Sequence, residues 1–169
     1  MSLSVYAASV PVLKQMLGSL AAILRKAEQH ATDRKIEPDA LLQSRLYPDM
    51  FPLTRQVEIA CDFARGIPAR LAGVDVMSIP DNHRSFAELQ QLIAQTEAFI
   101  DGIPAAAFDG SEGLEIVLRA GTPKEKRFRG QDYLIAYGLP QFFFHVMTVY
   151  ALLRHNGLEI GKKDYMGIA

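Results

Sequence analysis

Apolar residues recur at helical spacing in three separate stretches of the chain. These stretches cover residues 5–29, 52–71 and 85–101, and in each of them charged residues occupy the remaining faces. This pattern predicts three long amphipathic helices. The third helix has a clear start, because Ser85 and Glu88 are spaced as in a capping box.

The most apolar stretch of the chain, residues 132–156, predicts a fourth helix. We expect it to bend at Pro140 and to end at Gly157, which is a common residue just past a helix C-terminus. Because this stretch is apolar on nearly every side, it is expected to be the most enclosed element of the fold.

The periodicity changes between the third and the fourth helix. Residues 114–119 and 126–129 alternate imperfectly, and the segment 121–125 contains turn residues, which predicts a short β-hairpin. Residues 39–42 fit a short turn of helix, and residues 158–165 are expected to be extended or irregular. The prediction is a single all-α domain over residues 1–169, a four-helix bundle with a short β-hairpin inserted before the last helix.

Three polar residues interrupt the apolar stretch of the last helix. Gln141, His145 and Thr148 are spaced by four and three, which places them on one face. Buried polar groups need partners, so this face forms either an internal hydrogen-bond network or the lining of a pocket. Gln56 on the second helix and Tyr6 on the first are candidates to face it.

Charge and composition narrow the classes of partner. The chain has 18 basic and 19 acidic residues, so it has no positive surplus with which to bind nucleic acid or an anionic membrane. Residues 133–153 are apolar enough to resemble a membrane span, but polar residues interrupt them, which favours a buried bundle helix. The chain start lacks the features of a secretory signal, and we expect a cytoplasmic protein.

The remaining candidates for chemistry favour structural roles. No two of the four histidines lie three or four residues apart, as two metal ligands on one helix would. His30, His83 and His155 are expected at the surface. Cys61 falls on an apolar stripe, which favours a packed thiol over a nucleophile. No cofactor and no metal ligand is predicted from these residues.

Several short motifs carry a resemblance to a known family. They are Asp49–Leu53, Phe86–Leu89, Phe144–Val146, Leu153–Gly157 and Gly161-Lys162-x-Asp164-Tyr165. On these motifs the chain resembles an uncharacterised bacterial family of unknown function within the DinB/YfiT-like metalloenzyme superfamily. The resemblance implies a four-helix bundle that is often dimeric. It also implies relatives that hold a divalent metal with three histidines and include thiol-dependent transferases.

The sequence departs from that superfamily at the metal site. The relatives take one histidine from the second helix and two, four residues apart, from the last helix. Here residues 52–73 contain no histidine, and Val149 stands four residues after His145. At most one ligand of three remains, which is a poor zinc or nickel site.

Three functions remain open on the sequence. The preferred one is a small-molecule binder with a pocket around His145, Gln141, Thr148, Gln56 and Tyr6, without a complete metal site. The alternative is a DinB-like metal-dependent enzyme that uses His145 as one ligand. In the third, these residues form a core network and the protein is an oligomeric scaffold. We also predict a homodimer whose contact involves the first or the last helix, where Phe142, Phe143 and Met147 offer a large apolar area.

Overall fold

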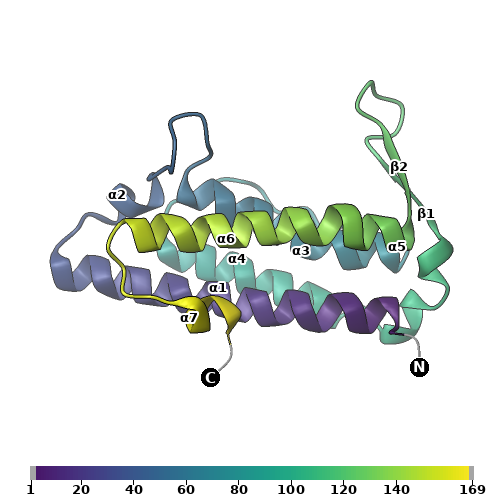
Figure 1. Cartoon of the computed structure of the whole chain (residues 1–169), viewed down its shortest axis with the longest axis horizontal. Helices are drawn as coiled ribbons and strands as arrows, with labels where there is room; N and C mark the ends of the chain where they lie inside the picture. The colour runs from purple at the N-terminus through teal and green to yellow at the C-terminus, as the bar shows by residue number, and fades with distance from the viewer. Residues whose placement is uncertain (1–2, 168–169) are drawn as a thin grey trace.

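The computed structural model describes residues 3–167, in which four long helices form a bundle (Figure 1). These helices are α1 (Val5–Arg34), α3 (Leu53–Leu71), α4 (Phe86–Asp101) and a last helix with three parts: α5 (Gly130–Asp132), the π-helical turn η3 (Tyr133–Gly138) and α6 (Leu139–His155). The shorter elements are α2 (Pro38–Leu42), the 3₁₀ turns η1 (Ala105–Phe108) and η2 (Ser111–Gly113), the strands β1 (Glu115–Leu118) and β2 (Lys126–Arg129), and α7 (Lys162–Met166). The predicted four-helix bundle with a hairpin before its last helix is confirmed.

Helix α3, and not the last helix, is the most enclosed of the four. It packs against α6, α4 and α1, and 14 of its 19 residues are buried, against 7 of the 17 residues of α6. The prediction for the last helix is wrong because one face of α6 points away from the bundle. On that face Phe144 is 55% exposed and Met147 is 46% exposed, whereas Phe142 points into the core.

Helix α4 begins at the predicted N-cap residue, but one of the two hydrogen bonds of the predicted capping box differs. The Ser85 hydroxyl accepts a hydrogen bond from the Glu88 N–H at 3.1 Å, as an N-cap residue does. The Glu88 carboxylate accepts from the N–H of Arg84 at 2.5 Å instead of the N–H of Ser85. The return bond of the capping box is therefore displaced by one residue.

The last helix is distorted immediately before Pro140. Proline has no N–H to donate to the carbonyl of Ala136, so a regular α-helical ladder cannot pass this point, and the wider turn η3 fills the gap. Gly138 lies in this turn, where an added Cβ would come within 2.9 Å of Ile67. The glycine thus lets the last helix approach α3 closely. The predicted bend at Pro140 takes the form of this π-helical turn.

The hairpin projects from one end of the bundle (Figure 1). Its two strands are antiparallel, with Ile116 opposite Phe128 and Leu118 opposite Lys126. Side chains at paired positions share a face of the hairpin. This face is turned toward the helices, because Ile116 is buried and the ring of Phe128 packs against Tyr137 at 5.1 Å.

The C-terminal segment differs from its prediction. The sequence predicts an extended or irregular tail over residues 158–165, whereas the structure has the short helix α7. The Asp164 carboxylate accepts from the N–H of Gly161 at 2.8 Å and pairs with Lys26 of α1. The hydroxyl of Ser19, also on α1, lies within hydrogen-bond distance of the Asp164 and Tyr165 carbonyls. Contacts with α1 therefore stabilise a helix that is too short to form alone.

In the described part of the chain, two helices are long and apolar enough, by length and composition, to cross a membrane. They are α1 and the continuous last helix from Gly130 to His155. Core helices of soluble bundles have the same length and composition. In the structure both helices contribute buried residues to the hydrophobic core.

Candidate functional site

A hydrogen bond between His145 and Gln56 joins α6 to α3 inside the bundle. Nδ1 of His145 lies 2.7 Å from Oε1 of Gln56, and both side chains are buried. The amide nitrogen of Gln56 donates to the carbonyl of Phe51 at 3.1 Å. Because a carbonyl only accepts, this bond fixes the orientation of the Gln56 amide and turns Oε1 toward the imidazole. The proton of His145 must then be on Nδ1.

The Nε2 atom of His145 is left as an acceptor. It has no hydrogen-bond partner among residues 3–167. Every fully buried side-chain nitrogen or oxygen in this part of the chain has a partner, so Nε2, which has none, is accessible to solvent. The ring stacks on Phe63, with centroids 6.0 Å apart, and meets the edge of Phe144 at 5.2 Å. Burial, assisted by the nearby charge of Arg55, lowers the pKa of His145 to about 4. The imidazole is therefore neutral near pH 7.

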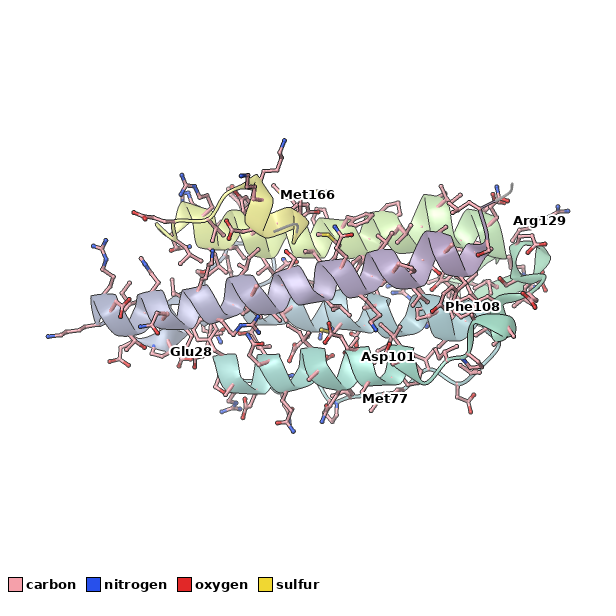
Figure 2. All side chains as sticks on the ribbon, turned by 90° about the horizontal axis from the view of Figure 1, so that it is seen from below. Glu28, Met77, Asp101, Phe108, Arg129 and Met166 are labelled. Atoms are coloured by element: carbon pink, nitrogen blue, oxygen red, sulfur yellow. The ribbon has the colours of Figure 1, made fainter. Side chains whose placement is uncertain are left out.

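The other residues predicted to face His145 lie in different surroundings. The hydroxyl of Thr148 donates to the Phe144 carbonyl of its own helix at 2.7 Å. Gln141 is half-buried and makes no side-chain hydrogen bond within residues 3–167. Tyr6 packs edge to face on Phe108 at 5.3 Å, and Phe108 lies at the same end of the bundle as Arg129 of the hairpin (Figure 2). Of the five predicted residues, only Gln56 and His145 bond to each other.

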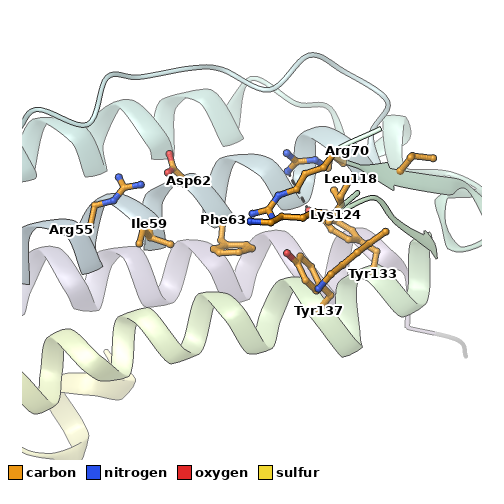
Figure 3. A pocket seen from close by; sticks show the side chains of 12 residues that line it. Arg55, Ile59, Asp62, Phe63, Arg70, Leu118, Lys124, Tyr133 and Tyr137 are labelled. Atoms are coloured by element: carbon orange, nitrogen blue, oxygen red, sulfur yellow. Dashed lines mark hydrogen bonds between the residues drawn. The ribbon is translucent and has the colours of Figure 1, made fainter. Parts of the chain in front are cut away.

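A pocket of about 400 Å³ lies beside this pair, between α3, the turn η3 and the hairpin (Figure 3). His145 does not line it, but Phe63, which stacks on His145, does. The residues that line the pocket come from three parts of the chain, and they are Arg55, Ile59, Asp62, Phe63, Arg70, Val117, Leu118, Arg119, Lys124, Lys126, Tyr133 and Tyr137. This volume falls within the range of sites that bind small molecules.

Aromatic rings form one wall of the pocket. Tyr133 and Tyr137 lie four residues apart in the widened turn η3, which keeps them on one side of the helix, and their rings stack at 6.0 Å. The ring of Phe63 meets Tyr137 at 6.2 Å from α3. The hydroxyl of Tyr133 accepts from Arg70 at 3.3 Å, which holds the ring in place. Burial raises the pKa of its phenol. The π-helical turn thus presents two tyrosines to the pocket.

The charges around the pocket are mainly positive. Five lining residues are basic and one, Asp62, is acidic. Asp62 is already paired with Arg65 at 2.5 Å, and Arg55 is paired with Asp81 and with Glu58. The remaining basic residues, Arg70, Arg119, Lys124 and Lys126, have no carboxylate within 4 Å in the described part of the chain.

Glu58 is a buried charged residue that the sequence interpretation missed. Its carboxylate lies 2.9 Å from Nδ1 of His83 and 3.2 Å from Arg55. His83 is therefore half-buried against α3, and its predicted surface role is wrong. In the sequence, Glu58 directly follows Val57, which belongs to the apolar stripe. This position beside the stripe could have predicted that the carboxylate lies at the border of the core.

Arg65 is a second buried charge, also missed. Its guanidinium pairs with Asp62 and donates to the Thr96 hydroxyl at 2.9 Å and to the Met77 carbonyl at 3.2 Å. With Glu58 it holds the segment 72–85 against α3. Glu58 and Arg65 are seven positions apart, which places both on one helix face.

Cys61 and the acidic residues provide little for metal or nucleophilic chemistry. Burial raises the pKa of the Cys61 thiol to about 12, so the thiol is protonated and inert near pH 7. Within residues 3–167 no three His, Cys, Asp or Glu side chains converge as metal ligands would. The side chains that contact His145 are the amide of Gln56 and the rings of Phe63 and Phe144, and these do not supply the ligands of the superfamily's three-histidine metal site.

The fold and its inserted hairpin define a DinB-like helical bundle. The chain is similar to the crystal structure of a DinB family member protein from Shewanella denitrificans, at 38% sequence identity and a TM-score of 0.91, over 97% of this chain and 92% of the other. The model of the family described as Domain of unknown function (DUF1993) matches residues 5–166. The chain belongs to this family. A comparison with curated proteins gives no significant match.

Proposed function

We propose that this protein is a soluble, cytoplasmic small-molecule binder, and that its binding site is the pocket beside the His145–Gln56 pair. The observation that carries the proposal is the pocket itself: about 400 Å³, with an aromatic wall and polar groups at its margin. Small-molecule sites in proteins combine these same features. The sequence predicts a site around the His145 side chain. In this proposal the site lies instead on the far side of Phe63, whose ring separates the imidazole from the pocket.

The rigid surroundings of the pocket support binding. Phe63 is supported from behind by His145, which is itself held by Gln56, and Tyr133 is held by Arg70. A site whose side chains are already fixed loses less conformational entropy when a ligand binds. In this proposal the His145–Gln56 pair positions the pocket wall and does not react.

The DinB-like metal-dependent enzyme remains the second candidate function. The observation in its favour is the unbonded Nε2 of His145, which is neutral and accessible, as a metal-ligating nitrogen must be. Within residues 3–167 no further ligands complete a metal site around it, so we place this candidate second.

We also propose that the protein associates with itself through the outer face of α6. Phe144 and Met147 expose large apolar side chains next to each other on this face, one turn apart. Neighbouring exposed apolar residues are typical of protein interfaces.

The small-molecule proposal is tested with phenylnaphthylamine, a neutral aromatic probe that fluoresces in apolar pockets. We expect saturable binding to the wild type and its loss in Ile59→Trp, because Ile59 lines the pocket and an indole would fill it. The matched control is Leu46→Trp in an exposed loop, which likewise adds one tryptophan to a chain that has none. Equal binding by both variants would contradict the proposal.

A further inference from the structure

The unpaired cations of the pocket converge on its aromatic wall. Nζ of Lys126 lies 5.1 Å from the centre of the Tyr137 ring. Arg70 donates to the Tyr133 hydroxyl, and neither cation has a carboxylate within 4 Å among residues 3–167. In Figure 3 Arg70, Lys124, Tyr133 and Tyr137 lie together at one end of the pocket. Two basic groups are thus held next to flat rings without an acidic partner.

The sequence of α3 fixes the position of the Arg70 side chain. Its guanidinium lies over the backbone of Gly66, where an added Cβ would come within 2.2 Å of Nη1. Glycine at this position leaves the space that the guanidinium occupies. Together with the bond to Tyr133, this packing holds Arg70 at the pocket instead of letting it extend into solvent.

Lys126 reaches the pocket through the register of the hairpin. It is paired with Leu118, which also lines the pocket, so both residues belong to the face that is turned toward the helices. Its neighbour Arg127 points the other way, where it is neutralised by Glu115 and Glu125. On the hairpin, the outward-facing Arg127 is therefore neutralised, whereas the inward-facing Lys126 remains available to a ligand in the pocket.

We infer that the pocket takes a small aromatic anion. Its negative group lies between Arg70 and Lys126, and its flat body lies against Phe63 and Tyr137. Carboxylate, sulfonate and phosphate groups all accept charge-assisted hydrogen bonds from arginine and lysine, and an aromatic body stacks on the rings. This inference rests on the proposed function and adds the chemical class of the ligand.

The test compares two probes that differ by one charge. Anilinonaphthalene sulfonate carries the ring systems of phenylnaphthylamine plus a sulfonate. We expect the sulfonate to bind the wild type more tightly than the neutral probe does, and to bind more weakly as salt is added, because salt screens its contacts with the cations. Binding of the neutral probe should not depend on salt.

Two substitutions locate the charge effect. In Arg70→Met and in Lys126→Met, affinity for the sulfonate should fall about tenfold relative to affinity for the neutral probe, because each variant removes one positive charge from the pocket. The control is Lys162→Met, which removes an exposed lysine on α7 and should change neither. Lys126 is exposed on the hairpin, so its variant decides the question even where Arg70→Met disturbs folding.

Each outcome separates the inference from the function on which it rests. Equal affinities for the two probes, both lost in Ile59→Trp, would overturn the anion inference and leave the pocket as a neutral binding site. Binding of both probes that is unaffected by Ile59→Trp, or no binding of either, would overturn both. A sulfonate preference that survives in Lys126→Met would also overturn the inference.

Discussion

Nδ1 of His145 donates to Oε1 of Gln56 at 2.7 Å, and this bond between residues 89 positions apart in sequence links α6 to α3. The direction of the bond follows from one further contact, the donation of the Gln56 amide to the Phe51 carbonyl. A loop carbonyl, an amide and an imidazole therefore form one ordered chain of hydrogen bonds. Its free end is Nε2, and the stacked face of the imidazole supports the pocket wall at Phe63.

His145→Ala should lower the free energy of unfolding by about 1–3 kcal/mol, because Oε1 of Gln56 would stay buried without a donor. Urea denaturation measures the change. In the double variant with Gln56→Ala the cost should be smaller than the sum of the two single costs, since the bond can be lost only once. His155→Ala, at the exposed end of α6, is the control and should change stability by less than about 0.5 kcal/mol. Strictly additive costs would show that the bond contributes nothing.

Stability should depend on pH through His145. Its pKa is about 4 in the folded protein and about 6.5 in the unfolded chain, so between these values the unfolded chain binds more protons. The free energy of unfolding should therefore fall as pH decreases from 6.5 to 4, by at most about 3 kcal/mol. His145→Gln should flatten this part of the pH profile. An imidazole that titrates near pH 6.5 by NMR would contradict the prediction.

The hairpin tip should be dispensable for the bundle. Replacing residues 121–125 by a short glycine linker removes one exposed ion pair, between Glu125 and Arg127, and exposed pairs contribute little. Helical content by circular dichroism should stay the same. A large drop would show that the segment supports the core. The strands β1 and β2 remain in this variant, whereas Lys124 is lost from the pocket lining.

The long elements of this fold could be predicted because local and tertiary preferences agree in them. The stripe of α3 and the cap of α4 are short-range patterns, and the structure follows them. The helix α7 could not be predicted, because its stability comes from Ser19 and Lys26, more than a hundred residues away. The exposed face of α6 was missed for a related reason: periodicity does not tell how many neighbours a helix will have.

The candidate site was predictable only in part. A histidine in an apolar helix indicates a buried partner, and Gln56 on the facing stripe was a reasonable choice. The pocket itself needs Arg70 on α3, which contacts Tyr133, and Lys126 on β2, which contacts Tyr137. Only the folded chain brings both residues to this stacked pair of rings. Tyr6 could not be placed by periodicity, because helical phase does not say at which end of the bundle a residue packs.

The proposed self-association should depend on the outer face of α6. Light scattering is expected to give twice the 18.7 kDa chain mass in the micromolar range. Replacing Phe144 and Met147 together by glutamate should give monomers, since charges would be buried at the contact. Val74→Glu, at an exposed position after α3, is the control. Phe142 is excluded from the contact because it is fully buried in the chain. A wild-type monomer throughout this range would remove the proposal.

Metal content decides between the two candidate functions. Tight binding of zinc or nickel needs three or four nitrogen, sulfur or carboxylate ligands at short range, and among residues 3–167 the one free ligand atom of the His145–Gln56 pair is Nε2 of His145. Purified protein should therefore contain far less than one metal ion per chain by elemental analysis. His145→Ala should leave that small content unchanged, although it lowers stability. Near-stoichiometric metal that disappears in His145→Ala would restore the metalloenzyme function. The further ligands would then have to come from acidic side chains that move toward Nε2, and in this structure the buried acid of α3, Glu58, is held by His83 and Arg55.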